Sequence, residues 1–200
     1  MLTLYDFLPS GNGYKVRLLL TQLGQPYELV QLDIARKETR TAEFLAKNPN
    51  GRIPCLRLED GTHLWESNAI QFYLAEGTPF LPAGKLERAQ VLQWMFFEQY
   101  SHEPYIAVVR SWHHFGTLDA NRAQLADKVE RGYAALGVME SHLATRAYFV
   151  AERYTIADVA LYAYTHVAPE GKFDLAPYPG VRRWLERVRA QPKYIPITKA

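Results

Sequence analysis

Hydrophobic and polar residues follow several different periods along the first eighty positions of the chain. Short apolar runs typical of strands lie at Leu2–Phe7, Tyr27–Leu32, Cys55–Leu58 and His63–Leu64. Helical periodicity covers Gly13–Leu23, Ala42–Ala46 and Ser67–Ala75. The pair Asp60-Gly61 between the last two strand runs is typical of a hairpin turn. The order strand, helix, strand, helix, strand, strand, helix predicts a small mixed sheet with helices on its faces.

The pattern of hydrophobic residues changes at a stretch rich in glycine and proline, which is incompatible with a helix or a strand. Gly77, Pro79, Pro82 and Gly84 break it, and every later period is helical. We therefore predict an α/β domain over residues 1–77, a linker over 78–84 and an all-helical domain over 85–200. The helical domain should contain one long helix through Val91 to Tyr100, a second over Asn121–Leu143, and two more near the C-terminus.

The last two predicted helices carry clear local signals. In TIADVALYAY, Thr155 is an N-cap and Asp158 follows three residues later, which is the spacing of a capping box. After Pro179, the residues Val181, Trp184 and Val188 share one helix face, so this helix should bury an apolar stripe.

Composition narrows the class of protein. A hydrophobic content of 48% with 13% aromatic residues predicts a sizeable ordered core. The net charge of +2 comes from 23 basic and 21 acidic residues spread along the chain, so a nucleic-acid partner is not expected. No apolar run reaches the roughly 20 residues of a membrane span and no secretory signal is recognisable, so we expect a cytoplasmic protein. The single cysteine, Cys55, has apolar neighbours and should be buried and inert.

A glycine-containing loop, Ser10-Gly11-Asn12-Gly13, lies between the first strand and the first helix. This arrangement can present backbone N–H groups to an anion. The dinucleotide fingerprint would need a glycine at Val16, and a P-loop would need Ser or Thr after Lys15, so neither nucleotide motif is present. The loop must serve another ligand.

Four stretches together resemble the cytosolic glutathione transferase family over essentially the whole chain. They are the strand-loop-helix start, NPNGRIPCL near residue 50, WESNAIQFYL near residue 66 and YTIADVAL near residue 154. The resemblance implies a thioredoxin-like N-terminal domain that binds glutathione, an all-helical C-terminal domain that shapes the second-substrate pocket, and a homodimer. No metal is expected, because adjacent His113 and His114 point to different helix faces and have no partners at ligand spacing.

The resemblance also implies how glutathione is held. The Ile53-Pro54 bond is expected to be cis, so that the Ile53 backbone pairs with the cysteinyl part of the ligand; an ordinary trans proline is the alternative. Ser67, where a helix begins, suits the γ-glutamyl carboxylate, although it could be a plain N-cap. Glu66 suits the amine of the same group.

Two loops contain basic and hydroxyl residues that are candidates to bind the glycyl end of glutathione. The guanidinium of Arg52 suits the glycyl carboxylate. Lys37, or Thr39 beside it, would assist from the loop after the second strand. The alternative for each basic residue is a solvated turn position.

The opening loop is expected to stabilise the glutathione thiolate. A free cysteine thiol has a pKa of about 8.5, and a helix N-terminus with a hydroxyl or amide donor lowers such a value. Ser10 and Asn12 are the candidate donors. The loop is similar to a bacterial and fungal subgroup with Thr/Ser-Pro-Asn-Gly-x-Lys, from which Gly11 departs. Tyr5, within the first strand, is expected to pack rather than to donate.

The second-substrate pocket is expected to be walled by the first helix after the linker. Its candidate residues are Phe97, Tyr100, Tyr105, Trp112 and His113, which would suit flat apolar electrophiles; core packing is the alternative for most of them. The expected function is a glutathione transferase acting on small hydrophobic electrophiles, with peroxidase and disulfide reductase activities as further options. The competing hypothesis is a non-catalytic scaffold of the same fold. Glu152 stands where many relatives have a glycine, so the local turn geometry is in question.

Overall fold

The computed structural model describes residues 1–199 and divides into two compact units. Unit 1 comprises residues 1–76 together with residues 192–199, and unit 2 comprises residues 77–191. The helical domain was predicted to cover residues 85–200. The segment that begins at Pro192 groups with unit 1 instead, where Tyr14 and Arg17 of the first helix donate hydrogen bonds to its carbonyls.

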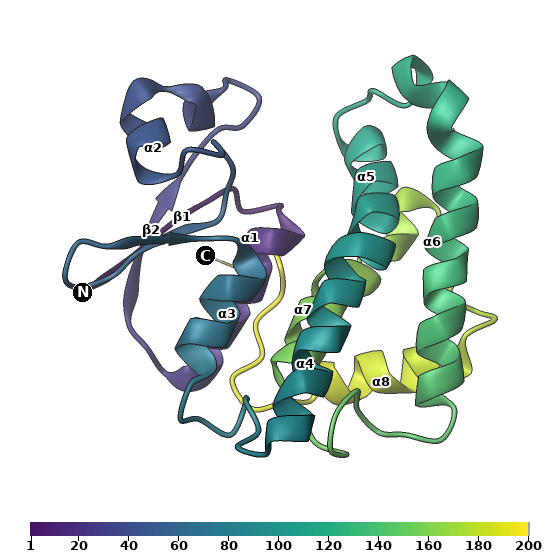
Figure 1. Ribbon diagram of the computed structural model, residues 1–200. Coiled ribbons are helices and arrows are strands. Elements are labelled where there is room, and N and C mark those ends of the chain that lie inside the picture. The colour runs from purple at the N-terminus through teal and green to yellow at the C-terminus, as the bar shows by residue number, and fades with distance from the viewer. Residues whose placement is uncertain (200) are drawn as a thin grey trace. The chain divides into compact units, whose positions relative to one another are not determined.

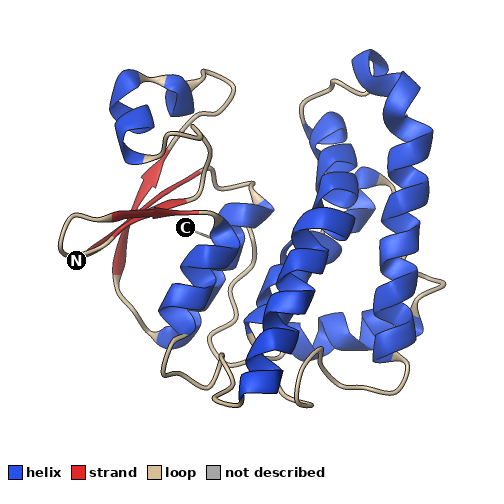
Figure 2. Ribbon diagram, in the orientation of Figure 1, coloured by secondary structure: helices blue, strands red, loops and turns tan. Residues whose placement is uncertain are grey.

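Unit 1 is built on a four-stranded mixed sheet, shown in Figure 2. Its strands are β1 (Leu2–Asp6), β2 (Tyr27–Gln31), β3 (Cys55–Arg57) and β4 (His63–Trp65). The strand order is β2-β1-β3-β4, with β1 parallel to β2 and antiparallel to β3, and with β3 antiparallel to β4. The predicted hairpin at Asp60-Gly61 is confirmed by the β3–β4 pairing.

Helices α1 and α3 lie side by side against this sheet (Figure 1). The helices of unit 1 are α1 (Gly11–Leu23), α2 (Ala42–Lys47) and α3 (Ser67–Ala75), and a 3-10 turn covers Glu38–Arg40. The core is apolar and fully buried, with members from two strands and two helices: Leu4, Val16, Leu20, Leu56 and Ile70. Each such side chain contributes roughly 1.5–3 kcal/mol of burial free energy, so this core holds α1 and α3 against the sheet.

Unit 2 is helical throughout. Its helices are α4 (Lys85–Phe97), α5 (Glu103–His114), α6 (Arg122–Leu143), α7 (Ile156–Thr165) and α8 (Pro179–Arg189). Short 3-10 turns cover Asp119–Asn121 and Ala168–Gly171. Among the described residues, no helix combines the length and the apolar character that a membrane crossing requires.

The predicted long helix through Tyr100 is interrupted. α4 ends at Phe97, a π-helical turn covers Glu98–His102, and α5 begins at Glu103. The sequence contains a signal for this break, because Pro104 lies in the first turn of α5, where a proline is tolerated although it is unfavourable inside a helix.

The capping box at the start of α7 is confirmed. The Asp158 carboxylate accepts hydrogen bonds from the Thr155 backbone N–H at 2.9 Å and the Thr155 hydroxyl at 3.1 Å. It also accepts from Trp184 Nε1 at 2.9 Å and from the Phe149 N–H at 3.2 Å. One buried carboxylate therefore joins α7, α8 and the loop that precedes α7. In that loop Glu152 has a φ of 48°, in the region that favours glycine, so the turn has the geometry that the sequence placed in question.

Candidate functional site

A cleft of about 540 Å³ opens in unit 1 beside the N-terminus of α1. Three stretches of chain contribute its lining: Ser10, Asn12, Ile34, Lys37, Thr39, Arg40, Gly51, Arg52 and Ile53. The structure thus brings together six residues that the sequence analysis chose for glutathione. Glu66 and Ser67 are connected to the same region through side-chain hydrogen bonds.

Ser10 lies at the N-cap of α1. Its backbone N–H donates to the Phe7 carbonyl at 2.8 Å, and its Oγ accepts from the Gly13 N–H at 3.4 Å. An oxygen that accepts from the helix can still donate its own hydrogen to an anion. Because the helix N-terminus also carries a partial positive charge, this position favours a thiolate over a thiol.

Asn12, Lys15 and Ser67 form one hydrogen-bonded group. Lys15 is fully buried, and its Nζ donates to Asn12 Oδ1 at 2.9 Å and to Ser67 Oγ at 3.4 Å. Ser67 Oγ donates to Asn12 Oδ1 at 3.2 Å. With its carbonyl oxygen occupied, Asn12 can offer a sulfur only its amide nitrogen. Lys15 was not among the residues predicted for the site, although it is the last residue of the Ser-Gly-Asn-Gly-x-Lys loop pattern.

Glu66 and Ser67 begin α3. Glu66 is the N-cap, and its φ of 70° is rare for a residue with a side chain. Ser67 is the first helical residue, so the alternative that it is a plain N-cap is wrong. The Asn50 amide donates to Glu66 Oε1 at 3.5 Å. The exposed Glu66 carboxylate and the buried Ser67 hydroxyl therefore offer opposite hydrogen-bonding character side by side.

The Ile53-Pro54 peptide is cis, as predicted. Ile53 lines the cleft, and the Arg52 carbonyl before it accepts from Asn48 Nδ2 at 2.7 Å. This bond ties the residues before β3 to the end of α2.

Three cationic residues line the cleft. Lys37 and Arg52 were predicted, and both are exposed. Arg40 was missed; its Nη1 donates to the Asn50 carbonyl at 3.0 Å. Thr39 is buried among them. This side of the cleft is therefore positively charged and suited to a carboxylate.

The residues predicted for the second-substrate pocket have different environments within unit 2. Tyr100 is 82% exposed, whereas Trp112 is only 9% exposed, which favours the core alternative for Trp112. Phe97 packs edge-on against Trp94 at 5.3 Å between ring centroids, and His113 is half-buried near the end of α5.

Tyr105 has charged neighbours. Lys128 Nζ lies 5.0 Å from its ring centroid, and Arg131 Nη1 donates to its hydroxyl at 3.4 Å. A cavity of about 300 Å³ in unit 2 is lined by other residues, Trp94, His142 and Phe149 among them. The assignment of the five residues to a second-substrate pocket stays a prediction.

Two expectations concern metals and thiols. Among residues 1–199, no three histidine, cysteine or acidic side chains are grouped to hold a metal ion. Buried His102 makes a 2.9 Å contact between its Nε2 and Thr165 Oγ1 instead. Burial raises the pKa of the Cys55 thiol to about 11, although the Lys47 charge lowers it. Cys55 is therefore a buried, unreactive thiol, as predicted.

Comparison with known proteins gives concordant results for both units. Residues 1–76 match the family model of the glutathione S-transferase N-terminal domain, and residues 93–192 match that of the C-terminal domain. A glutathione S-transferase structure from Pseudomonas fluorescens is 53% identical, with a TM-score of 0.97 and 99% of each chain covered. A glutathione transferase from Burkholderia graminis, solved with two glutathione molecules per subunit, is 29% identical with a TM-score of 0.84; 96% of this chain and 85% of that one are covered. The disulfide-bond oxidoreductase YfcG of Escherichia coli is 32% identical over 96% of this chain and 92% of its own length.

Proposed function

The chain belongs to the glutathione S-transferase family, and on this premise we propose that it is a catalytic member. In this proposal it binds glutathione in the cleft of unit 1, stabilises the glutathione thiolate at the N-terminus of α1, and transfers it to small hydrophobic electrophiles. The observation that carries the proposal is the joint position of Ser10 and Asn12 on that cleft with the cationic residues on its other side.

Binding would use both ends of the tripeptide. The glycyl carboxylate would lie near Lys37, Arg40 and Arg52, where charge-assisted hydrogen bonds are strongest. The γ-glutamyl carboxylate would accept from the Ser67 hydroxyl at the start of α3, close to the buried Lys15 charge, and its amine would pair with Glu66. The Ile53 backbone would pair with the cysteinyl residue between them.

The chemical step needs the thiol proton to leave. A hydrogen bond from Ser10 or from the Asn12 amide, together with the partial charge of the helix, would lower the thiol pKa, so the proton is released to solvent near neutral pH. The sulfur then attacks an electrophilic carbon. A carbon–sulfur bond forms, and either a leaving group departs with its electron pair or the adduct takes up a proton from solvent.

A second candidate reaction is disulfide reduction by glutathione. It is favoured by the similarity to the Escherichia coli oxidoreductase and by the inert Cys55, which leaves glutathione as the source of every reacting thiol. One glutathione thiolate would attack the substrate disulfide, forming a mixed disulfide and releasing one substrate thiolate. A second glutathione thiolate would attack the mixed disulfide, forming oxidised glutathione and releasing the other substrate thiolate.

Calorimetric titration with glutathione in buffers of different ionisation enthalpy tests the proposal. The wild type should release a measurable fraction of a proton at neutral pH, and Ser10→Ala should bind with similar affinity but release less. Ser141→Ala, which removes an exposed hydroxyl on α6, is the matched control and should behave as the wild type. Absence of glutathione binding by the wild type would favour the scaffold. Unchanged proton release in Ser10→Ala would assign the donor role to Asn12 or to the helix backbone.

We also propose a homodimer, as the family resemblance implies. Sedimentation velocity of the chain at micromolar concentration checks this; a monomer at every concentration would contradict it.

A further inference from the structure

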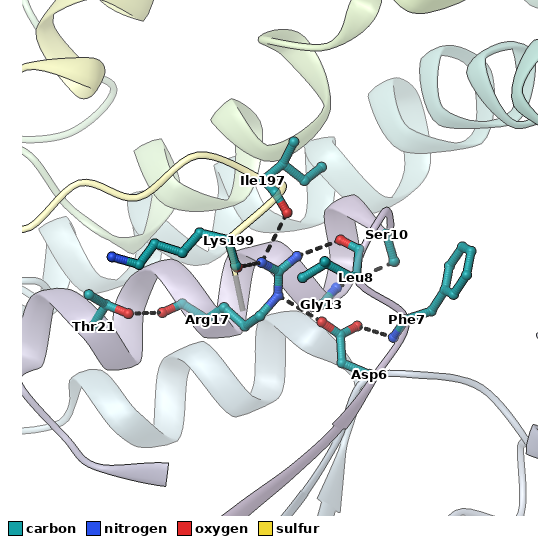
Figure 3. A network of polar contacts seen from close by, with 9 residues as sticks. All are labelled: Asp6, Phe7, Leu8, Ser10, Gly13, Arg17, Thr21, Ile197 and Lys199. Atoms are coloured by element: carbon teal, nitrogen blue, oxygen red, sulfur yellow. Dashed lines mark hydrogen bonds and ion pairs between the residues drawn. The ribbon is translucent and has the colours of Figure 1, made fainter. Parts of the chain in front are cut away.

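The loop between β1 and α1 is anchored by two buried charged residues, Asp6 and Arg17 (Figure 3). Arg17 Nε donates to Asp6 Oδ2 at 2.9 Å, and both side chains are fully buried. The other Asp6 oxygen accepts from the Phe7 N–H at 2.7 Å. Arg17 Nη2 donates to the Leu8 carbonyl at 2.6 Å. Residues on both sides of the Phe7–Leu8 peptide are therefore held by one ion pair.

The hold on Leu8 extends to Ser10. The Ser10 N–H donates to the Phe7 carbonyl at 2.8 Å, and the Ser10 hydroxyl then caps α1. A methyl group on Gly13 would lie 1.6 Å from Asp6 Oδ1, so the Asp6 carboxylate is in contact with the first turn of the helix. The position of the Ser10 hydroxyl thus depends on the positions of Asp6 and Arg17.

The remaining nitrogen of Arg17 connects this loop to a distant part of the sequence. Arg17 Nη1 donates to the carbonyls of Ile197, at 3.0 Å, and Lys199. Nearby, the Tyr14 hydroxyl donates to the Ile195 carbonyl at 2.7 Å. The planar guanidinium fixes the directions of all its hydrogen bonds together. Arg17 therefore joins the segment 192–199 to the Leu8 carbonyl through one rigid group.

At neutral pH the ion pair is charged. Burial raises the pKa of the Asp6 carboxyl to about 6, whereas the Arg17 charge and hydrogen bond lower it. Two titratable groups face this pair: Tyr14 on α1, whose ring centroid lies 5.6 Å from Arg17 Cζ, and Tyr27 on β2, whose pKa is raised, mainly by burial. Above about pH 6 the loop is thus held by the charged Asp6–Arg17 ion pair.

We propose that Arg17 is a positioning residue for thiolate formation: by joining the Leu8 carbonyl to the carbonyls of Ile197 and Lys199, it fixes the Ser10 hydroxyl where the glutathione sulfur binds. This inference rests on the proposed function. Its physical basis is that hydrogen bonds weaken steeply with misalignment, so a small displacement of the loop reduces stabilisation of the thiolate. The carboxylate-binding residues at Arg52 and Ser67 lie on other elements and are not held by Arg17.

Deletion of residues 197–200 tests this proposal. It removes the two carbonyl partners of Arg17, whereas the matched triple variant Ile197→Ala, Thr198→Ala and Lys199→Ala removes only side chains. Two quantities are measured for each: the pKa of bound glutathione, from thiolate absorbance against pH, and the Kd of S-methylglutathione, which has no thiol. We expect the deletion to raise the thiol pKa by about one pH unit, the triple variant to leave it unchanged, and the Kd of S-methylglutathione to change less than about threefold in both.

Other results would overturn the proposal. An unchanged thiol pKa in the deletion variant would exclude the carbonyl connection, and an equal rise in the triple variant would assign the effect to side-chain packing. A parallel loss of S-methylglutathione binding would indicate general damage to unit 1. If the deletion prevents folding, Arg17→Lys tests the proposal instead. Lysine keeps the charge beside Asp6 but cannot hold the three carbonyl partners of Arg17 in fixed directions, so this variant should raise the thiol pKa similarly. Failure of the proposed function is distinguishable, since the wild type itself would then bind no glutathione or leave its thiol pKa at the free value.

Discussion

At the residue scale, the candidate site depends on a few buried polar side chains whose partners are distant in sequence. Lys15 joins Asn12 on α1 to Ser67 on α3, and is fully buried. A buried ammonium group persists only where acceptors surround it, and its charge acts strongly on nearby anions because water is excluded. Lys15 therefore links the expected thiolate position to the expected carboxylate position.

Replacement of this charge should weaken binding at both positions. We expect Lys15→Met to reduce glutathione affinity about tenfold, which corresponds to roughly 1.4 kcal/mol, and to raise the pKa of the bound thiol. Isothermal titration and thiolate absorbance measure the two effects. Lys85→Met, at the exposed start of α4, is the control. Equal behaviour of the two variants would remove Lys15 from the site.

His166 gives a pH-dependent prediction. Burial lowers its pKa to about 4, while an unfolded histidine has a pKa of about 6.5. The unfolded chain therefore takes up a proton before the folded one, and stability is lost as pH falls from about 6.5 to 4. Relative to the wild type, His166→Gln should gain about 2 kcal/mol in free energy of unfolding between pH 7 and pH 4.5. Urea denaturation at the two pH values measures this difference. A difference that does not vary with pH would show that His166 is protonated equally in both states.

At the element scale, the contact between β1 and α1 depends on a glycine. Because a methyl group on Gly13 would collide with the Asp6 carboxylate, Gly13→Ala should cost about 2–3 kcal/mol of stability or more. Gly137 on α6 offers the opposite case, since a methyl group there meets nothing within 4 Å. Gly137→Ala should stabilise by about 0.5–1 kcal/mol through helix propensity. Denaturant unfolding measures the stability of both variants. Equal destabilisation by Gly13→Ala and Gly137→Ala would show that the Asp6 contact is not the cause.

At the start of α7, the buried Asp158 carboxylate should contribute more to the stability of unit 2 than the Thr155 cap does. Asp158→Ala would leave four donors without their acceptor, and we expect a loss of about 3 kcal/mol or more. Thr155→Ala, which removes the cap alone, should cost about 1–2 kcal/mol. As a control, Asp174→Ala removes an exposed acid that accepts from the Ala176 N–H and should have little effect. Thermal and urea unfolding measure all three; equal losses for Asp158→Ala and Asp174→Ala would contradict the account.

Much of the architecture was predictable because it is encoded locally. The hairpin at Asp60-Gly61, the Thr155 cap and the stripe of α8 each follow from residues within one turn or one helix. Two features were not predicted, the place of Arg40 on the cleft and the position of the segment that begins at Pro192. Arg40 lines the cleft only because the chain folds that way, and the segment from Pro192 is held by hydrogen bonds from Arg17 and Tyr14. No local pattern marks such contacts.

At the scale of the whole molecule, each unit has its own core and its own polar anchor. Unit 1 contains the candidate glutathione residues, and within it the Asp6–Arg17 pair joins the first strand, the first helix and the segment 192–199. Unit 2 is organised around α7, every residue of which is buried. The division explains why the glutathione site can be described from unit 1 alone, although its residues come from positions 10 to 67.

The central claim is that the N-terminus of α1 stabilises a glutathione thiolate. The most direct test is the thiolate absorbance of glutathione bound to the wild-type chain, followed from pH 5 to pH 9 at saturating protein. The account predicts a pKa for the bound thiol at least about one pH unit below the value of roughly 8.5 for a free cysteine. A bound thiol that titrates at its free value would contradict it.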